Sequence, residues 1–198
     1  PNENFFSVSN FRYYAVRDRL PLAFSRAWDA YPLEIDFVIL KTGSQGPAFS
    51  IAKAARIMAK IEAGDPSFEK VFPIIGEFPL PDGSVGSVRR RSLAAVPGVA
   101  PGVLARRFRT GAEQFVAQFA RDVEGLEIRM AFTPAELLRG GIDRVHISAL
   151  KATVGEFSTK RPPLALRDIG ATLEGLRVNP HRLLATGEVE PLELGTLR

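Results

Sequence analysis

Cysteine is absent from the 198 residues, and histidine occurs only at His146 and His181. Without cysteine the chain can form no disulfides, thiolate zinc sites or iron–sulfur clusters, and it has no cysteine nucleophile. Neither histidine has a second histidine or a carboxylate at a spacing typical of metal ligands. We therefore expect no metal and no cofactor.

Motifs of common catalytic sites are also missing. The chain has no GxSxG motif, no Walker sequence and no dinucleotide-binding glycine pattern. Residues 41–43 (KTG) and 50–53 (SIAK) superficially match two serine β-lactamase motifs, but their order is reversed and the chain is too short for that fold. A strand-ending turn and a helix-capping serine explain them better. We therefore do not expect an enzyme.

Long apolar runs are lacking as well. The densest run, Phe37-Val38-Ile39-Leu40, has the length of a strand, whereas a transmembrane helix needs about 18 consecutive apolar residues or more. With 45% hydrophobic and 24% charged residues, the composition is that of a folded globular protein. A chain of this length can bury a sizeable core.

Basic residues outnumber acidic ones by 26 to 22, which gives a formal net charge of +4. The densest basic sequences are residues 89–91 and the arginines at 106, 107 and 109. A solvated loop and an exposed helix start are the ordinary interpretation, and anionic lipid headgroups or an acidic protein are the alternatives. We expect no nucleic acid as partner, because the basic residues are not interleaved with stacking aromatics.

Prolines divide the first hundred residues into short pieces, so residues 1–100 are predicted to be an irregular, Pro-rich region with short helices. We expect a short helix from Pro21 to Trp28, a buried strand at 33–40, and a helix from Ser50 to Gly64. From Phe68 to Val103 the Gly/Pro-rich sequence predicts an extended connector, with at most a short strand at 72–75.

A basic stripe lies along the predicted helix that follows Ser50. Lys53, Arg56 and Lys60 recur there at helical spacing. Such a stripe is most often the solvated face of a helix, and contact with lipid headgroups or with a partner protein is the alternative.

Residues 101–198 have more regular patterns. Between Pro101 and Gly125 apolar residues recur every three or four positions, which predicts a helix of about 22 residues with one aromatic-rich stripe. Strands are predicted at 126–132, 142–157, 164–178 and 183–194, with one helical turn at 135–138. This order predicts an α+β domain, in which a long amphipathic helix packs on a curved antiparallel sheet.

Residues 137–143 (LLRGGID) follow the predicted helix and strand, and residues 183–189 (LLATGEV) contain a second leucine–glycine element. With strands expected at 147–154, 164–169 and 173–178, this order resembles the LmeA-like phospholipid-binding domain family. The resemblance covers about 95 residues, from Val103 onward, and corresponds to the first half of the family's domain. The first hundred residues have no counterpart in it.

The resemblance implies a curved sheet with a helix across it, enclosing an apolar groove for acyl chains. It also implies a membrane-peripheral location, in the bacterial cell envelope or in thylakoid and plastid membranes of cyanobacterial descent. We therefore expect a non-catalytic lipid-binding protein. The alternative is a structural accessory subunit of a larger membrane complex, for example a photosynthetic one, whose other chains contact residues 1–100.

Two groups of site residues follow from this hypothesis. Apolar residues of the helix and first strand are expected to face lipid: Phe108, Phe115, Phe119, Ile128, Met130 and Phe132. Basic residues are expected to contact headgroups or a partner: Lys53, Arg56, Lys60, Arg106 and Arg107. The same apolar residues also suit an ordinary helix–sheet core, and the sequence leaves both interpretations open.

The pair Gly140-Gly141 predicts a tight turn with at least one glycine at positive φ. Leu137 and Leu138 are expected to pack under the helix, and Arg139 to point to solvent or to headgroups.

Overall fold

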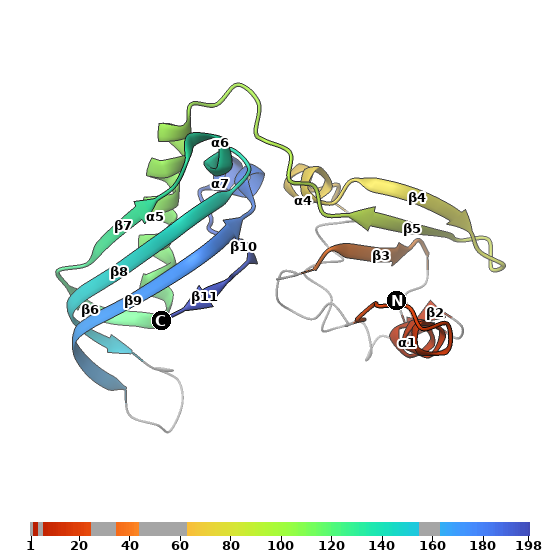
Figure 1. Cartoon of the computed structure of the whole chain (residues 1–198), viewed down its shortest axis with the longest axis horizontal. Helices are drawn as coiled ribbons and strands as arrows, with labels where there is room; N and C mark the ends of the chain where they lie inside the picture. The colour runs from red at the N-terminus through yellow and green to blue at the C-terminus, as the bar shows by residue number, and fades with distance from the viewer. Residues whose placement is uncertain (1, 4–5, 25–34, 44–62, 155–162) are drawn as a thin grey trace. The chain divides into compact units, whose positions relative to one another are not determined.

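The computed structural model describes residues 2–3, 6–24, 35–43, 63–154 and 163–198 (Figure 1). The chain divides into two compact units, Pro1–Ser92 and Leu93–Arg198. Each unit has its own sheet, so we describe them in turn.

The first unit contains a three-stranded antiparallel sheet in the order β3-β5-β4. Its strands are β3 (Phe37–Lys41), β4 (Ile74–Pro79) and β5 (Val85–Arg90). Helix α4 (Pro66–Val71) begins at a favourable cap, because the Asp65 side chain accepts a hydrogen bond from the Ser67 amide and Pro66 occupies the first turn. Phe68 and Phe72 are buried at this helix.

Three expectations for this unit are wrong. The segment 68–103 is not an extended connector, because β4 and β5 form a hairpin closed at Gly83, whose φ is +80°. Of the helix predicted from Pro21 to Trp28, residues 21–24 are not helical and residues 25–28 lie outside the described residues. An unpredicted helix, α1 (Val8–Arg17), lies earlier, after the short pair β1 (Asn2–Glu3) and β2 (Phe6–Ser7). Of the buried strand predicted at 33–40, only residues 37–40 are extended, as part of β3, and they are not buried, since Phe37 is 47% exposed. Residues 33–34 lie outside the described residues, as does the helix predicted from Ser50 up to residue 62.

The second unit confirms the expected α+β class: α5 (Pro101–Phe119) packs against a strongly curled antiparallel sheet (Figure 1). The sheet has the order β10-β9-β8-β6, with β7 also paired to β8 and β11 to β9. Its strands are β6 (Ala120–Glu124), β7 (Glu127–Ala131), β8 (Gly141–Val154), β9 (Leu164–Val178), β10 (Pro191–Glu193) and β11 (Thr196–Leu197). We call the sheet face that α5 covers the inner face and the opposite one the outer face.

Two breaks in the long β8–β9 ribbon account for its curl. The strands keep one register along their whole length, but the pairs Asp143/Gly175 and Leu150/Asp168 are interrupted. Gly175 and Asp168 have φ of +65° and +49° there. Between the breaks the buried apolar side chains of β8 are those of odd-numbered residues, Val145 and Ala149, whereas beyond the breaks they are those of even-numbered residues, Ile142 and Ala152. Each break therefore turns the ribbon, as a β-bulge does.

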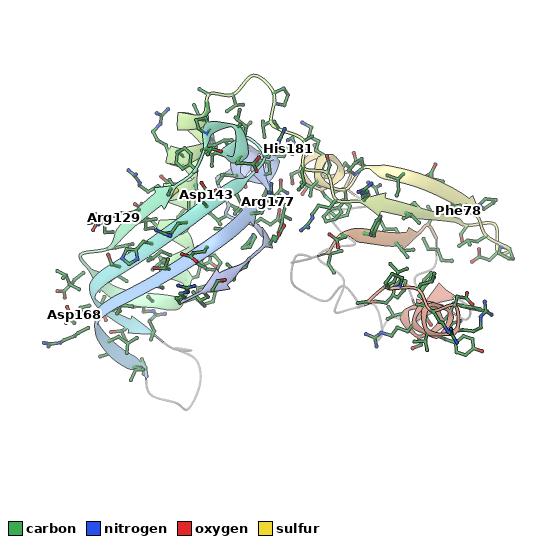
Figure 2. All side chains as sticks on the ribbon, viewed as in Figure 1. Phe78, Arg129, Asp143, Asp168, Arg177 and His181 are labelled. Atoms are coloured by element: carbon green, nitrogen blue, oxygen red, sulfur yellow. The ribbon has the colours of Figure 1, made fainter. Side chains whose placement is uncertain are left out.

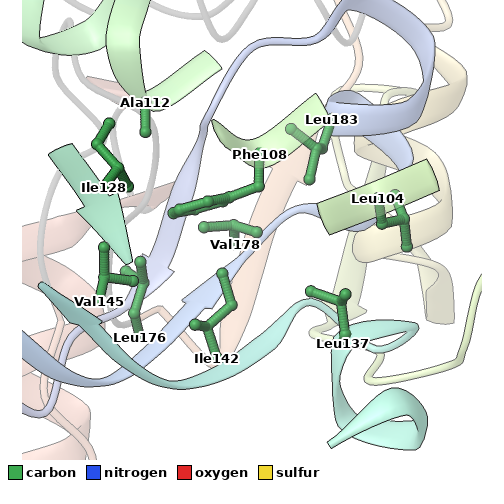
Figure 3. Close-up of a cluster of buried hydrophobic side chains, with 10 residues drawn as sticks. All are labelled: Leu104, Phe108, Ala112, Ile128, Leu137, Ile142, Val145, Leu176, Val178 and Leu183. Carbon is green, nitrogen blue, oxygen red and sulfur yellow. The ribbon is translucent and has the colours of Figure 1, made fainter. Parts of the chain in front are cut away.

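The core of this unit lies between α5 and the inner face (Figure 3). Leu104, Phe108 and Ala112 form the buried stripe of α5, spaced one helical turn apart. They share a cluster with buried residues of the sheet and of the two short helices α6 (Pro134–Leu137) and α7 (Pro180–Thr186). The other members of the cluster are Ile128, Leu137, Ile142, Val145, Leu176, Val178 and Leu183.

The turn between α6 and β8 confirms the expectation made for it. Gly140 has φ +81°. Leu137 is fully buried and Leu138 is partly buried against the same core. The Arg139 side chain is 51% exposed and forms an ion pair with Glu136 at 3.3 Å.

Two expectations for this unit are wrong. The long helix ends at Phe119 rather than near Gly125, because residues 120–124 pair with β8 as strand β6. Residues 183–194 do not form one strand: Leu183 lies in α7, Gly187 ends that helix with φ +79°, and only 191–193 are extended and paired. The strand expected at 142–157 is β8, and residues 155–157 lie outside the described part.

Candidate functional site

The apolar stripe of α5 is longer than the core it enters. Leu104 and Phe108 are 0% and 2% exposed, but Phe115 and Phe119 on the same face are 42% and 58% exposed. Their ring centroids lie 5.1 Å apart in a tilted arrangement. The C-terminal end of α5 therefore presents an apolar surface, which we call the aromatic end.

The inner face is also incompletely covered. Ile147 and Leu173 pack against the core but remain only partly buried. Every second residue of a strand lies on the same face, so Ala171 and Ile169 of β9 share the inner face with Leu173. Both are half-buried. Apolar surface thus remains accessible both on the helix and on the sheet.

Three arginines of α5 have no acidic partner among the described residues: Arg106, Arg107 and Arg109 are all exposed and form no ion pair there. Arg106 and Arg107 line a hollow of about 300 Å³ together with Gly187 at the end of α7. The helix therefore presents free guanidinium groups in the same unit as the aromatic end.

Gly111 positions this hollow. A Cβ atom at Gly111 would collide with the carbonyl oxygen of Gly187 and would lie 2.9 Å from Cγ2 of Val189. Only glycine allows α7 to approach α5 this closely. The contact places the end of α7 beside Arg106 and Arg107.

The predicted lipid-facing residues separate into two groups. Phe108 and Ile128 are 2% and 7% exposed, so the expectation that they face lipid is wrong: helix and sheet are in direct contact there and leave no groove. Met130 and Phe132 are partly buried against the same core. Phe115 and Phe119 remain accessible, as do Arg106 and Arg107. Lys53, Arg56 and Lys60 lie outside the described residues.

Sequence reasoning missed a polar hollow of about 540 Å³ on the outer face. Its lining includes Arg129, Arg144, His146 and Arg198, and Arg129 is labelled on β7 in Figure 2. The alternation of β8 could have indicated it, because Arg144, His146 and Ser148 share one face of that strand.

No helix in the described part of the chain is long and apolar enough to cross a membrane. The described residues also contain no group of three or more histidine, aspartate or glutamate side chains placed to hold a metal ion. No family model, curated protein or solved structure matches the chain.

Proposed function

We propose that this chain is a non-catalytic, membrane-peripheral protein that binds lipid through the aromatic end of α5. The observation that carries this proposal is the exposure of Phe115 and Phe119 on the stripe that buries Leu104 and Phe108. Adjacent apolar side chains left in water mark surfaces that another apolar partner covers.

The charges favour an anionic lipid surface as that partner. Burial of apolar area contributes about 25 cal/mol per Å², so acyl chains gain from covering both rings. Each basic residue near an anionic bilayer adds about 1 kcal/mol. Arg106, Arg107 and Arg109 are free to supply this attraction, since none has an acidic partner within the described residues. The resemblance of residues 103–198 to LmeA-like domains implies the same class of ligand.

Vesicle flotation tests the proposal. We expect the chain to float with vesicles of phosphatidylglycerol and phosphatidylcholine, more weakly with phosphatidylcholine alone, and to retain lipid in native mass spectra. Failure to bind either vesicle, together with lipid-free mass spectra, would falsify the proposal.

Matched variants identify the surface. Phe115→Gln with Phe119→Gln should abolish flotation, whereas Phe78→Gln should not, although Phe78 on β4 is similarly exposed at 56% (Figure 2). Arg106→Gln with Arg107→Gln should weaken binding to anionic vesicles only. Arg167→Gln, which removes an exposed arginine of β9, should leave binding unchanged.

The first unit favours a second function, that of an accessory subunit in a membrane complex. Tyr13, Tyr14 and Val16 on α1 are 62%, 49% and 80% exposed, and Ile75 on β4 is 57% exposed. A protein partner would cover such side chains. We expect such a subunit to co-migrate with a membrane complex in native gels, and Tyr13→Ser with Val16→Ser to release it. A monodisperse monomer that never co-migrates with a complex argues against this function.

A further inference from the structure

The hollow on the outer face is built from a row of side chains that crosses four neighbouring segments of the sheet. Arg129 pairs with His146 across β7 and β8, and His146 pairs with Thr172 across β8 and β9. Thr172 in turn exchanges two backbone hydrogen bonds with Arg198, of 2.8 and 2.9 Å. Neighbouring strands lie about 4.8 Å apart, so the four side chains stand close together on one face.

A second row supplies another guanidinium. Ala131 pairs with Arg144, and Arg144 pairs with Glu174. Arg144 Nη2 lies 3.2 Å from Oε1 of Glu174, and Arg198 Nη2 lies 3.9 Å from Oε2 of the same carboxylate. Glu174 thus holds two guanidinium groups beside the hollow, while the small side chain of Ala131 leaves space between the rows.

Cationic groups outnumber acidic ones around this space. Three arginines and one glutamate line the hollow. Just outside it, Glu127 Oε1 and Oε2 accept hydrogen bonds from Arg129 at 2.7 and 2.8 Å. The three positively charged guanidinium groups therefore outnumber the two carboxylates by one, even when His146 is neutral.

His146 contributes a further polar atom. Its Nδ1 lies 3.0 Å from the Thr172 hydroxyl, and Nε2 has no partner among the described residues. If Nδ1 carries the proton, it donates a hydrogen bond to the Thr172 hydroxyl; if it does not, it accepts one from that hydroxyl. When Nδ1 accepts the hydroxyl proton or the ring is protonated, Nε2–H is a donor available to a ligand.

We propose that this outer-face hollow binds a phosphate group. Guanidinium groups match phosphate oxygens with two parallel hydrogen bonds, and the three arginines reach the hollow from three different segments. The site lies on the face opposite α5, so the proposal is independent of the aromatic end. The phosphate belongs either to a soluble phosphate ester or to a phospholipid headgroup.

Titration with inorganic phosphate, followed by NMR of the His146 ring and by calorimetry, tests the site. We expect saturable binding with a stoichiometry of one. Arg144→Gln with Arg198→Gln should weaken it at least about tenfold, which corresponds to about 1.4 kcal/mol. Arg129→Gln is the second variant, because its side chain is 71% exposed and its loss should not affect folding. Arg167→Gln, an exposed change on β9 away from the hollow, is the control and should bind phosphate as the unchanged chain does.

Two arms distinguish the sources of the phosphate. Glycerol 3-phosphate represents a soluble ester, and vesicles of phosphatidic acid with phosphatidylcholine represent a headgroup. The probe whose binding is weakened by the arginine variants represents the kind of phosphate that this site binds. Phe115→Gln with Phe119→Gln should leave inorganic phosphate binding intact, which separates this site from the lipid-binding function. Absence of saturable binding, or equal weakening by Arg167→Gln, overturns the proposal.

Discussion

Phe108 and Phe115 lie on the same face of α5, two turns apart, yet Phe108 is 2% exposed and Phe115 is 42% exposed. The helix therefore continues its apolar stripe beyond the part of the sheet that it packs against. This change in environment along one stripe underlies the lipid-binding proposal and can be measured as stability.

Phe108→Ala should lower the free energy of unfolding by about 3–5 kcal/mol, the usual cost of removing a buried phenylalanine. Phe115→Ala and Phe119→Ala should each cost roughly 1 kcal/mol or less, because water already contacts these rings. Urea unfolding of the three variants checks this. Equal decreases in the free energy of unfolding for all three variants would mean that Phe115 and Phe119 belong to the core.

Gly140 should tolerate no side chain. Its φ is +81°, and a Cβ atom would collide with the carbonyl oxygen of Val178. Gly187 has φ +79° but open space around its Cβ position, so it serves as a matched control. We expect Gly187→Ala to cost about 1 kcal/mol of backbone strain and Gly140→Ala to cost about 3 kcal/mol or more. Similar unfolding midpoints for the two variants would contradict the close contact at Val178.

Gly111→Ala should destabilise the chain although alanine favours helices. In an exposed helix interior the exchange gains about 0.5–1 kcal/mol. At Gly111 the new methyl group would meet Gly187 and Val189 and would push α7 away. Gly102→Ala is the control on the same helix, because its Cβ atom would meet only the Arg106 side chain, at 4.0 Å. We expect a lower thermal midpoint for Gly111→Ala and an unchanged or higher one for Gly102→Ala; the reverse order would exclude the α5–α7 contact.

Acid should weaken the first unit through Asp82. Lys41 Nζ lies 2.8 Å from Oδ2 of Asp82, and hydrogen bonds from Lys41 and then from Ser84 hold the pKa of Asp82 below its usual range. A carboxyl group whose pKa is lowered by folding stabilises the fold above its unfolded pKa of about 3.8, and this contribution is lost as the pH falls toward the folded pKa.

Asp82→Asn should therefore unfold at lower urea concentration than the unchanged chain at neutral pH, and the difference should shrink in acid. NMR signals of β5 report this unit during unfolding. Glu77→Gln, an exposed change on the neighbouring strand β4, is the control and should show no such pH dependence. A difference that stays constant between neutral and acidic pH would exclude the ionised pair as its cause.

The regular elements of the second unit could be predicted because local pattern and tertiary packing agree there. Glu127–Ala131 alternates strictly, and Leu164–Val178 was predicted with its observed bounds. Strand β6 could not be predicted, since Phe119 and Val123 continue the helical spacing of α5. Pairing with β8, including a bulge at Asp122 with φ +51°, outweighs that local preference.

Other errors had usable signals. Asn179 caps α7 with its side chain, Pro180 follows at the first helical position and Gly187 ends the helix, which together form a standard helix signature. Residues 81–83 (PDG) stand between two strands and are typical of a hairpin turn. The outer-face hollow needed the pairing of strands far apart in sequence, because Arg129, His146 and Arg198 meet only through the register of the sheet.

Residue-level contact with lipid tests the central claim most directly. The chain would be mixed with nanodiscs of phosphatidylglycerol and phosphatidylcholine that carry a spin label on the acyl chain, and the NMR signals of phenylalanine rings would be recorded. We predict strong broadening of the Phe115 and Phe119 ring signals, while those of buried Phe108 and of exposed Phe78 stay sharp. Sharp Phe115 and Phe119 signals, or equal broadening at Phe78, would contradict lipid binding through the aromatic end of α5.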